Sequence, residues 1–281
     1  MFLAGIKKEL KLFTRGFRFW GILIAIIGIA VAYPGMYKLI ELMGEMLKNL
    51  SAEAGVEMDE ALNSVTGMMD SLAMLYGGSL SNVGYYMGIL SFTAEGFLIM
   101  GLLLMATAGG EQKKRSVIMP NCAGLTPAGY VVPKFVLYPV IIGALAFLGT
   151  ILTAFVSQAM FGDPIAFDTM MFSGSCVAFY IVFMVSVYFL FGIATGRPGI
   201  GVVVMYFGAS IFPTILNAFG INKYNPFALQ GMIMTSVAEA DMQNYWFSVV
   251  ITLVIAVICC LLSLVITTVR KIDNSEGEAN L

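Results

Sequence analysis

One carboxylate of this chain occupies a position where it could do chemistry. Glu95 stands inside an apolar run that extends from Val83 to Ala108. An ionisable side chain within a membrane span is costly unless it faces water or a polar partner, so it is a functional-site hypothesis by default. The sequence therefore predicts that Glu95 lines a pathway through a membrane. The alternative is a hydrogen bond that locks two helices together.

Several other chemistries lack the residues that they need. The sequence contains no His, which excludes His-Glu-x-x-His metal sites and His-based proton relays. It has no Gly-x-x-x-x-Gly-Lys-[Ser/Thr] motif for nucleotide hydrolysis. We expect no enzyme activity in the chain itself, and no bound metal, cofactor or nucleic acid.

Long apolar runs are the elements that must position Glu95. A helix needs ~20 residues to cross the ~30 Å hydrocarbon core of a membrane. The chain is 59% hydrophobic and 11% charged, and its apolar runs are too long for barrel strands. We predict an all-α polytopic membrane protein, with one six-helix transmembrane domain over residues 19–269. The expected spans are Phe19–Met36, Val83–Ala108, Val136–Phe161, Met170–Ala194, Gly199–Phe219 and Trp246–Val269.

The basic residues predict the orientation of these spans. Of the fifteen Lys and Arg residues, all but Lys38, Lys48 and Lys223 fall on one side of the expected membrane. An excess of basic residues marks the cytoplasmic side. Both termini, including a tail at residues 270–281, are therefore expected in the cytoplasm. The expected location is a cell membrane, with bacterial origin favoured.

The first residues predict an interfacial amphipathic helix over residues 1–18. Ile6, Leu10, Phe13 and Phe17 recur at helical spacing, while basic residues cover much of the remaining surface. Such a helix lies in the membrane surface with its basic side toward anionic head groups. The alternative is a charged leading segment that only sets the orientation.

Two segments are expected outside the cell. Residues 38–82 form an acidic loop, predicted as two amphipathic helices broken around Ser51–Gly55. This loop is either a cap over an exit path or a simple link between spans. Residues 220–245 contain an apolar run that is too short to span, which predicts a re-entrant or interfacial segment. Asn225 and Pro226 begin that run and are candidates for an external gate.

Residues 109–134 form the cytoplasmic loop that follows the second span. Its charged residues are Glu111, Lys113, Lys114, Arg115 and Lys134. Thr126 and Pro127 predict a helix start, with Thr126 as the cap and Pro127 at the first helical position. The loop could be gripped by a partner protein, or could be an ordinary basic loop. In the second span, Gly84-x-x-x-Gly88 predicts a close helix contact.

Together these features resemble the permease subunits of type 2 ABC exporters. The resemblance covers the whole chain. It rests on the basic amphipathic helix, the six spans, Glu111 after the second span, and Thr126-Pro127 followed by Lys134. Asn225-Pro226 before the last span is also similar to the family. Two departures are Gly129, where a basic residue often stands, and Lys113-Lys114-Arg115-Ser116 in place of the usual Gly-Thr.

The resemblance implies a partner that supplies energy. Two permease chains, identical or homologous, would pair in the bilayer, and separate ATP-binding subunits with their ATP and magnesium would dock from the cytoplasm. The coupling residues would be Glu111, Lys113, Lys114, Arg115, Thr126, Pro127 and Lys134. The many Phe and Met residues favour an amphipathic cargo such as a peptide, drug or lipid-like molecule. The alternatives are a membrane scaffold or sensor that binds through its acidic loop, and an ion-coupled carrier that uses Glu95.

Overall fold

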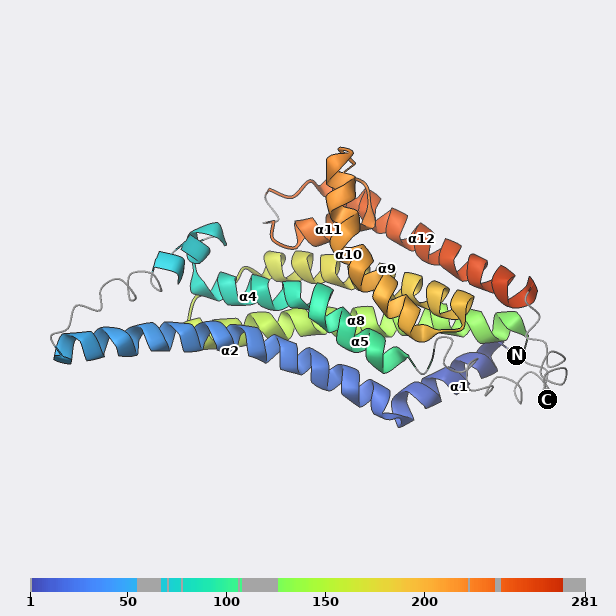
Figure 1. The fold of residues 1–281 in the computed structure, drawn as a ribbon, viewed down its shortest axis with the longest axis horizontal. Coiled ribbons are helices and arrows are strands. Elements are labelled where there is room, and N and C mark those ends of the chain that lie inside the picture. Colours follow the sequence, from blue (N-terminus) through green and yellow to red (C-terminus); the bar gives the residue numbers. More distant parts are fainter. Residues whose placement is uncertain are drawn as a thin grey trace.

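The computed structural model is an elongated bundle of helices (Figure 1). It describes residues 2–54, 67–69, 71–76, 78–105, 107, 126–221, 223–235 and 239–269, and no strand occurs among them. Six helical stretches in this part are long and apolar enough to cross a membrane, as the sequence predicts. They are α2 (Phe17–Ala54), α4 to α5 (Leu80–Leu104), α8 (Pro127–Phe161), α9 (Phe167–Thr195), α10 (Pro198–Ala218) and α12 (Met242–Val269).

The start of the chain and the end of α12 lie at the same end of the bundle, on the right in Figure 1. We call this the terminal end, and the opposite one the far end. The helix α1 (Phe2–Arg15) and the first turns of α8 also lie at the terminal end. Which side of the membrane this end faces stays a prediction of the charge asymmetry.

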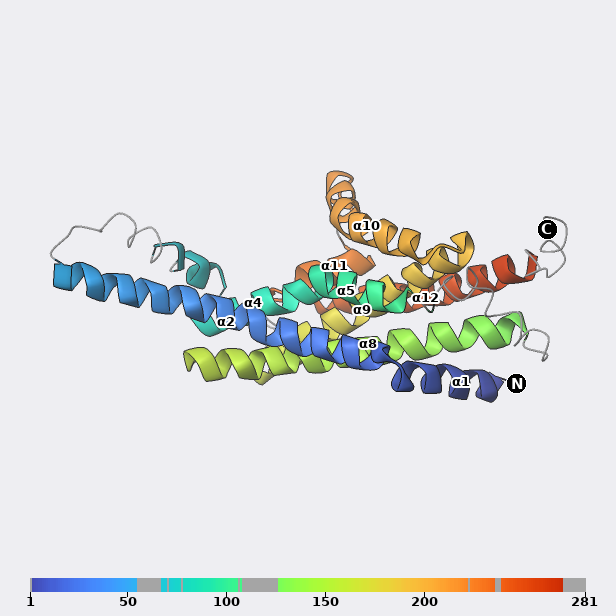
Figure 2. The ribbon, with the colours of Figure 1, turned by 60° about the horizontal axis from the view of Figure 1, so that its bottom comes forward.

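The first span is longer than predicted. The sequence ends it at Met36 and expects a separate helix in the acidic loop, but α2 continues unbroken to Ala54. It extends past its neighbours at the far end in both ribbon views (Figures 1 and 2). Good helix formers such as Leu, Lys, Glu and Met follow the apolar run. The helix therefore continues beyond the end of that run. The end at Ala54 agrees with the predicted break, and residues 55–66 lie outside the described part.

The second span has three parts. The helix α4 (Leu80–Ser91) is followed by a π-helical turn, η1 (Phe92–Gly96), and then by α5 (Phe97–Leu104). Ser79 caps α4 by accepting a hydrogen bond from the Asn82 N–H at 3.2 Å. The π-helical turn shifts the register of the side chains that follow it, so α5 presents different residues to its neighbours than a regular helix would.

The helix α9 forms the centre of the bundle. Its large side chains Tyr180, Tyr188 and Phe189 are fully buried, and it touches α8, α10, α11 (Pro226–Met232) and α12. A short link joins α8 to α9 and begins at Gly162, which has a positive φ of 87°. Glycine adopts this conformation at little cost and often ends a helix in this way.

The helix α10 stands apart from the rest. It bends away from the long axis of the bundle in both ribbon views (Figures 1 and 2), and Val203, Phe207 and Ile211 on it are exposed. Pro213 lies inside the helix and has no N–H to bond the carbonyl of Ala209, four residues earlier. The missing bond supplies a cause for the bend.

Close helix contact at the predicted glycine motif is confirmed. A Cβ added to Gly84 would lie 2.7 Å from Oγ of Ser157, and one added to Gly88 would lie 2.6 Å from Cγ2 of Thr153. Both distances are shorter than non-bonded atoms tolerate. The backbone of α4 at the two glycines therefore packs directly against side chains of α8. Pro34 of α2 lies on the same glycines, 3.4 Å from the added Cβ at Gly84. We call this contact of α2, α4 and α8 the glycine seam.

The helix α1 packs on α8, and the interfacial position expected for it stays a prediction. Gly5, Glu9 and Phe13 are buried, whereas Leu10 and Phe17 of the predicted apolar face are exposed. A Cβ added to Gly5 would lie 2.7 Å from the carbonyl oxygen of Gly129, so the helices approach closely here. The buried residues Gly5, Glu9 and Phe13 are spaced by four, so they lie on one face of α1.

Candidate functional site

The π-helical turn presents Glu95 on the surface of the bundle. Phe92, Thr93 and Gly96 of this turn are buried, whereas Ala94 and Glu95 are exposed. Glu95 follows Leu80 by fifteen residues, which places it about 22 Å along the second span. A carboxylate at such a depth must face water or a polar partner, because lipid cannot solvate it. π-Helical turns occur often at functional sites.

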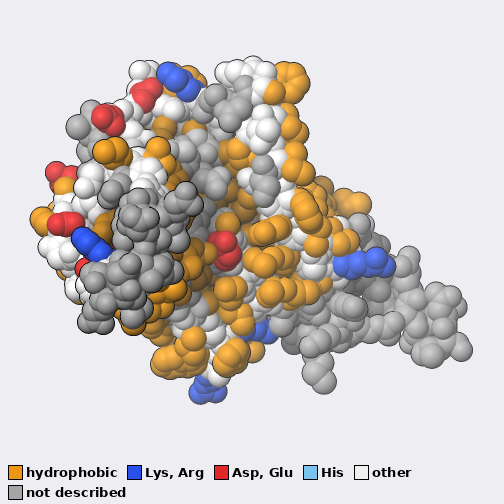
Figure 3. Space-filling view, turned by 60° about the vertical axis from the view of Figure 1, so that its left-hand side comes forward, with side chains coloured by type: hydrophobic (Ala, Val, Ile, Leu, Met, Phe, Trp, Pro, Cys, Tyr) orange, Lys and Arg blue, Asp and Glu red, His pale blue; other side chains and the backbone are white. Residues whose placement is uncertain are grey.

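Tyr33 of α2 is a polar neighbour of Glu95. The Tyr33 hydroxyl interacts with the Glu95 carboxylate and with the Ser91 side chain. Tyr33 is only partly buried, so this contact does not seal Glu95 within the bundle. Seen from the far end, the surface is hollowed, and acidic atoms lie there among hydrophobic side chains (Figure 3).

A cavity of about 310 Å³ lies against η1 and the start of α5, and the Glu95 side chain is not part of its lining. Ala94 and Phe97, which flank Glu95 in the sequence, line it together with Thr93. The opposite walls come from other helices, with Met184 on α9, Tyr206, Ala209 and Pro213 on α10, and Gln230 on α11. The lining is mainly apolar and aromatic with a few hydroxyl and amide groups, which is typical of sites for small organic molecules.

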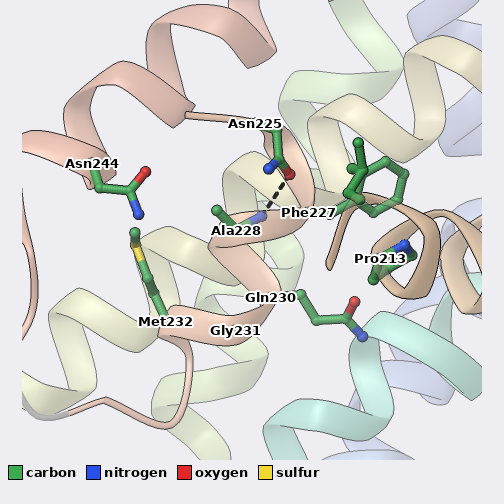
Figure 4. A pocket seen from close by; sticks show the side chains of 9 residues that line it. Pro213, Asn225, Phe227, Ala228, Gln230, Gly231, Met232 and Asn244 are labelled. Atoms are coloured by element: carbon green, nitrogen blue, oxygen red, sulfur yellow. Dashed lines mark hydrogen bonds between the residues drawn. The ribbon is translucent and has the colours of Figure 1, made fainter. Parts of the chain in front are cut away.

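A second cavity, of about 340 Å³, adjoins the first. Pro213 and Gln230 line both cavities, so we treat them as one hollow between η1, α10 and α11. Figure 4 shows Asn225, Asn244, Phe227 and Met232 around this second part. The hollow therefore runs from the middle of the second span toward the start of α12.

The sequence positions α11 through a cap and an aromatic anchor. The Asn225 side chain accepts a hydrogen bond from the Ala228 N–H at 3.0 Å, and Pro226 occupies the first helical turn (Figure 4). Phe227 packs edge-on against Phe183 at 5.3 Å between ring centroids. Phe183 lies sixteen residues, about 24 Å, from the start of α9, so α11 sits beside the middle of a span.

Gln230 connects α11 to the π-helical turn. Its side-chain N–H donates a hydrogen bond to the Thr93 hydroxyl at 3.2 Å, and Thr93 donates to the Leu90 carbonyl at 2.7 Å. The Gln230 side chain reaches away from Asn244 and toward the second span (Figure 4). The neighbouring residue Gly231 lines the hollow without a side chain. A movement of α11 would therefore strain or break the hydrogen bond that joins it to the turn carrying Glu95.

A second cluster of charge lies at the terminal end. The Lys134 ammonium group is 2.9 Å from one Glu9 carboxylate oxygen, and the Tyr138 hydroxyl donates to the other oxygen at 3.0 Å. The Lys134 nitrogen also lies 4.8 Å from the centre of the Tyr130 ring. Both charged side chains are almost fully buried. We call this group the Glu9–Lys134 cluster.

This cluster changes the position expected for Lys134. The sequence places it in a polar loop that ends at residue 134, but α8 begins at Pro127 and Lys134 lies within that helix. The predicted helix start is confirmed, because Thr126 accepts a hydrogen bond from the Gly129 N–H at 3.1 Å. Glu111, Lys113, Lys114 and Arg115 lie outside the described residues.

Glu9 is the residue that the sequence analysis missed. It is the one acidic residue among the first forty of the chain, in a segment rich in Lys and Arg. A single acid in a basic helix is a signal that could have been noticed. Its partner is 125 residues away, and no local spacing points to that distance.

The described residues contain no group of three or more His, Cys, Asp or Glu side chains that could hold a metal ion. In comparisons with protein families, with curated proteins and with solved structures, the chain has no match. The six long apolar helices are those of a multi-pass helical membrane protein.

Proposed function

We propose that this chain is a permease subunit of an ATP-driven exporter in a bacterial cell membrane. With a second permease chain it would form the pathway for an amphipathic cargo. The observation that supports this most is the hollow between η1, α10 and α11, whose lining combines aromatic rings with amide groups, next to a turn that carries the exposed Glu95. A pathway for amphipathic molecules needs both kinds of surface.

The second chain follows from the exposure of Glu95 and Ala94. Lipid would leave the carboxylate unsolvated, so another chain or a water-filled path should cover this face. A second permease placed against η1 and α10 would turn two half-open hollows into one enclosed path. In such an assembly the bend of α10 and the depth of α11 would set the shape of the path on both sides.

The energy would come from an ATP-binding subunit that contacts residues 109–134 and the surface of α1. This loop leads directly into α8, and α8 is fixed to α1 by the Glu9–Lys134 cluster. A force applied to the loop would therefore move both helices together. Closure of the ATP-binding subunits could then bias the bundle between two states that open the hollow to opposite sides.

The docking part is tested by the charges of the loop. Thr126 and Pro127 are poor probes, because Thr126 caps α8 and its loss alone would weaken the helix. We expect the combined change of Lys113, Lys114 and Arg115 to Gln to reduce co-purification of an ATP-binding subunit from bacterial membranes, together with vanadate-sensitive ATP hydrolysis. The same change at Lys48, at the far end, is the control. If the complex forms equally well without the loop charges, or no ATP-binding subunit co-purifies with the unaltered chain, the proposal is wrong.

An ion-coupled carrier is the second candidate, favoured by the contact between Glu95 and the Tyr33 hydroxyl. Acid and phenol side chains in this arrangement can pass a proton or hold a cation. The two candidates differ in their source of energy. Export that survives ATP depletion and stops with an uncoupler would favour the carrier.

A further inference from the structure

We propose that the hollow between η1, α10 and α11 binds uncharged apolar molecules that carry an amide, such as a short hydrophobic peptide with both ends capped. This inference rests on the proposed function and adds that the cargo enters the hollow without a charge. Two features support it, which are the uncharged and partly aromatic walls of the hollow and two amide side chains with unused hydrogen-bonding capacity.

The described lining of the hollow contains no charged side chain in either part. Lys223 and Asp241, which flank α11 in the sequence, lie 3.7 Å from each other and do not line it. A charged ligand would leave water for walls that offer no opposite charge, and such a transfer is costly. An uncharged ligand avoids this cost, so the walls select against ions.

The aromatic walls favour a ligand with apolar groups. Phe97 and Tyr206 line one part of the hollow, and Phe227 lines the other. Met184 and Met232 add flexible side chains, which adapt to ligands of different shape. These walls can bury the apolar side chains of a ligand, and that burial is the main favourable term in its binding.

Two amide side chains of the lining keep unused hydrogen-bonding capacity. The Gln230 amide nitrogen donates to Thr93 at 3.2 Å, whereas its carbonyl oxygen accepts no hydrogen bond from the described residues. The Asn244 oxygen accepts a hydrogen bond from the Tyr224 N–H at 2.7 Å. Its amide nitrogen, which points toward Met232 in Figure 4, has no acceptor in the described part of the chain. The walls therefore offer one acceptor and one donor, and an amide group supplies the complement of each.

The third amide of the lining is already engaged. The Asn225 oxygen accepts from the Ala228 N–H at 3.0 Å, and its amide nitrogen donates to the Ile221 carbonyl at 2.9 Å. Asn225 therefore positions α11 and leaves recognition to the other two amides. Asn244 is only 6% exposed, so its unpaired N–H is costly, and a ligand carbonyl would remove that cost.

The test uses three tritiated forms of one dipeptide that differ in charge. N-acetyl-phenylalanyl-leucinamide is uncharged, N-acetyl-phenylalanyl-leucine has a free carboxylate, and phenylalanyl-leucinamide has a free amino group. Both charges are present at about pH 6. Equilibrium dialysis at that pH measures binding to the purified chain in phosphatidylcholine nanodiscs. We expect saturable binding of the uncharged form, with a dissociation constant at least about tenfold lower than that of either charged form.

Gly231→Leu tests the place of binding. Gly231 lines the hollow, and a Cβ added to it meets nothing within 4 Å, so a larger side chain occupies the open space without displacing protein. The dissociation constant of the uncharged form should rise at least about tenfold, with the unfolding temperature unchanged. Gly28→Leu on α2 is the matched control, since a Cβ added there also meets nothing within 4 Å, and it should not alter binding.

Gln230→Met tests the recognition of the amide. It keeps the length of the side chain and removes the carbonyl acceptor, so the dissociation constant should rise about threefold to tenfold. Thr93→Val breaks the same bond between α11 and η1 but keeps the Gln230 amide, so it should weaken binding less.

The inference is overturned if the uncharged form shows no saturable binding, or if Gly231→Leu binds it as well as the unaltered chain. Equal binding of all three forms would overturn the selection against charge. Unchanged binding by Gln230→Met would overturn the role of the amide. The ATP-binding partner is judged by the loop-charge experiment, so failure of the proposed function and failure of this inference can be told apart.

Discussion

Glu9 and Glu95 are two carboxylates in mainly apolar surroundings, and the fold treats them in opposite ways. Glu9 is buried at the terminal end with Lys134 at 2.9 Å and Tyr138 at 3.0 Å. Glu95 is exposed at membrane depth, with Tyr33 nearby and no cation within ion-pair distance among the described residues. The two sites also differ in their surroundings, because close helix contacts enclose Glu9 whereas the turn that carries Glu95 has a hollow against its residues Thr93 and Ala94.

The two carboxylates differ in burial, because Glu9 is paired inside the protein whereas Glu95 is exposed. A buried ion pair is costly to break, since either partner alone would be a charge without compensation. The Glu9–Lys134 cluster therefore joins α1 to α8 in this structure. Glu95 has no such ion pair among the described residues. Three substitutions test this contrast.

The largest effect is expected at the terminal end. Lys134→Met removes the cation beside Glu9, and the free energy of unfolding should fall by about 3–5 kcal/mol. Thermal unfolding of the purified chain in detergent measures this loss. Replacing both partners, with Glu9→Leu and Lys134→Met, should restore much of it, because no buried charge remains.

The control is another Lys–Glu pair of the same chain. Lys38 and Glu41 are 2.6 Å apart, but their side chains are 33% and 27% exposed. Lys38→Met should cost less than about 1 kcal/mol, because water solvates the carboxylate that remains. Equal losses for the two Lys variants would show that burial does not distinguish the pairs and would remove the basis of the comparison.

An intermediate effect is expected at the glycine seam. Gly88→Ala places a methyl group 2.6 Å from Thr153, and the crowding should lower the free energy of unfolding by about 1–3 kcal/mol. Gly28→Ala on α2 is the matched control, since its added methyl group meets nothing within 4 Å. A Gly88→Ala protein as stable as the unaltered one would show that α4 and α8 can move apart at the glycine seam without loss.

The smallest effect on stability is expected at Glu95. Glu95→Gln keeps the shape of an exposed side chain, so the free energy of unfolding should change by less than about 0.5 kcal/mol. The same thermal measurement in detergent applies. A loss comparable to that of Lys134→Met would show that Glu95 locks helices together, which is the alternative reading of its sequence position.

The sequence predicts the spans well, because their signal is local. The second, fourth, fifth and sixth spans begin and end within a few residues of the expected places, and Thr126 and Asn225 cap the helices that follow them. A run of apolar residues and a cap next to Pro need no knowledge of the partner helices. The contact of Gly84 and Gly88 is visible for the same reason.

The features missed depend on contacts between distant segments. The π-helical turn at Phe92–Gly96 contains no Pro, and nothing in its composition distinguishes it from a regular helix. The Glu9–Lys134 pair joins residues 125 positions apart. The buried face of α1 follows from the close approach of Gly5 to α8, whereas the apolar spacing favours Leu10 and Phe17. In each case the feature depends on a helix that is distant in the sequence. The local pattern of apolar residues carries no information about that helix.

The unbroken length of α2 has a mechanical consequence. Its 38 residues extend over about 57 Å of helix axis, with a change of direction near the middle in Figure 1. Pro34, near the middle, rests on Gly84 and Gly88, so the glycine seam can serve as a fulcrum. A lever pivoted there swings its two arms in opposite directions, and a tilt of about 5° carries each tip by about 2 to 3 Å. A tilt of α2 at this contact would therefore move its far-end part and the part next to α1 in opposite directions, without any helix changing its length.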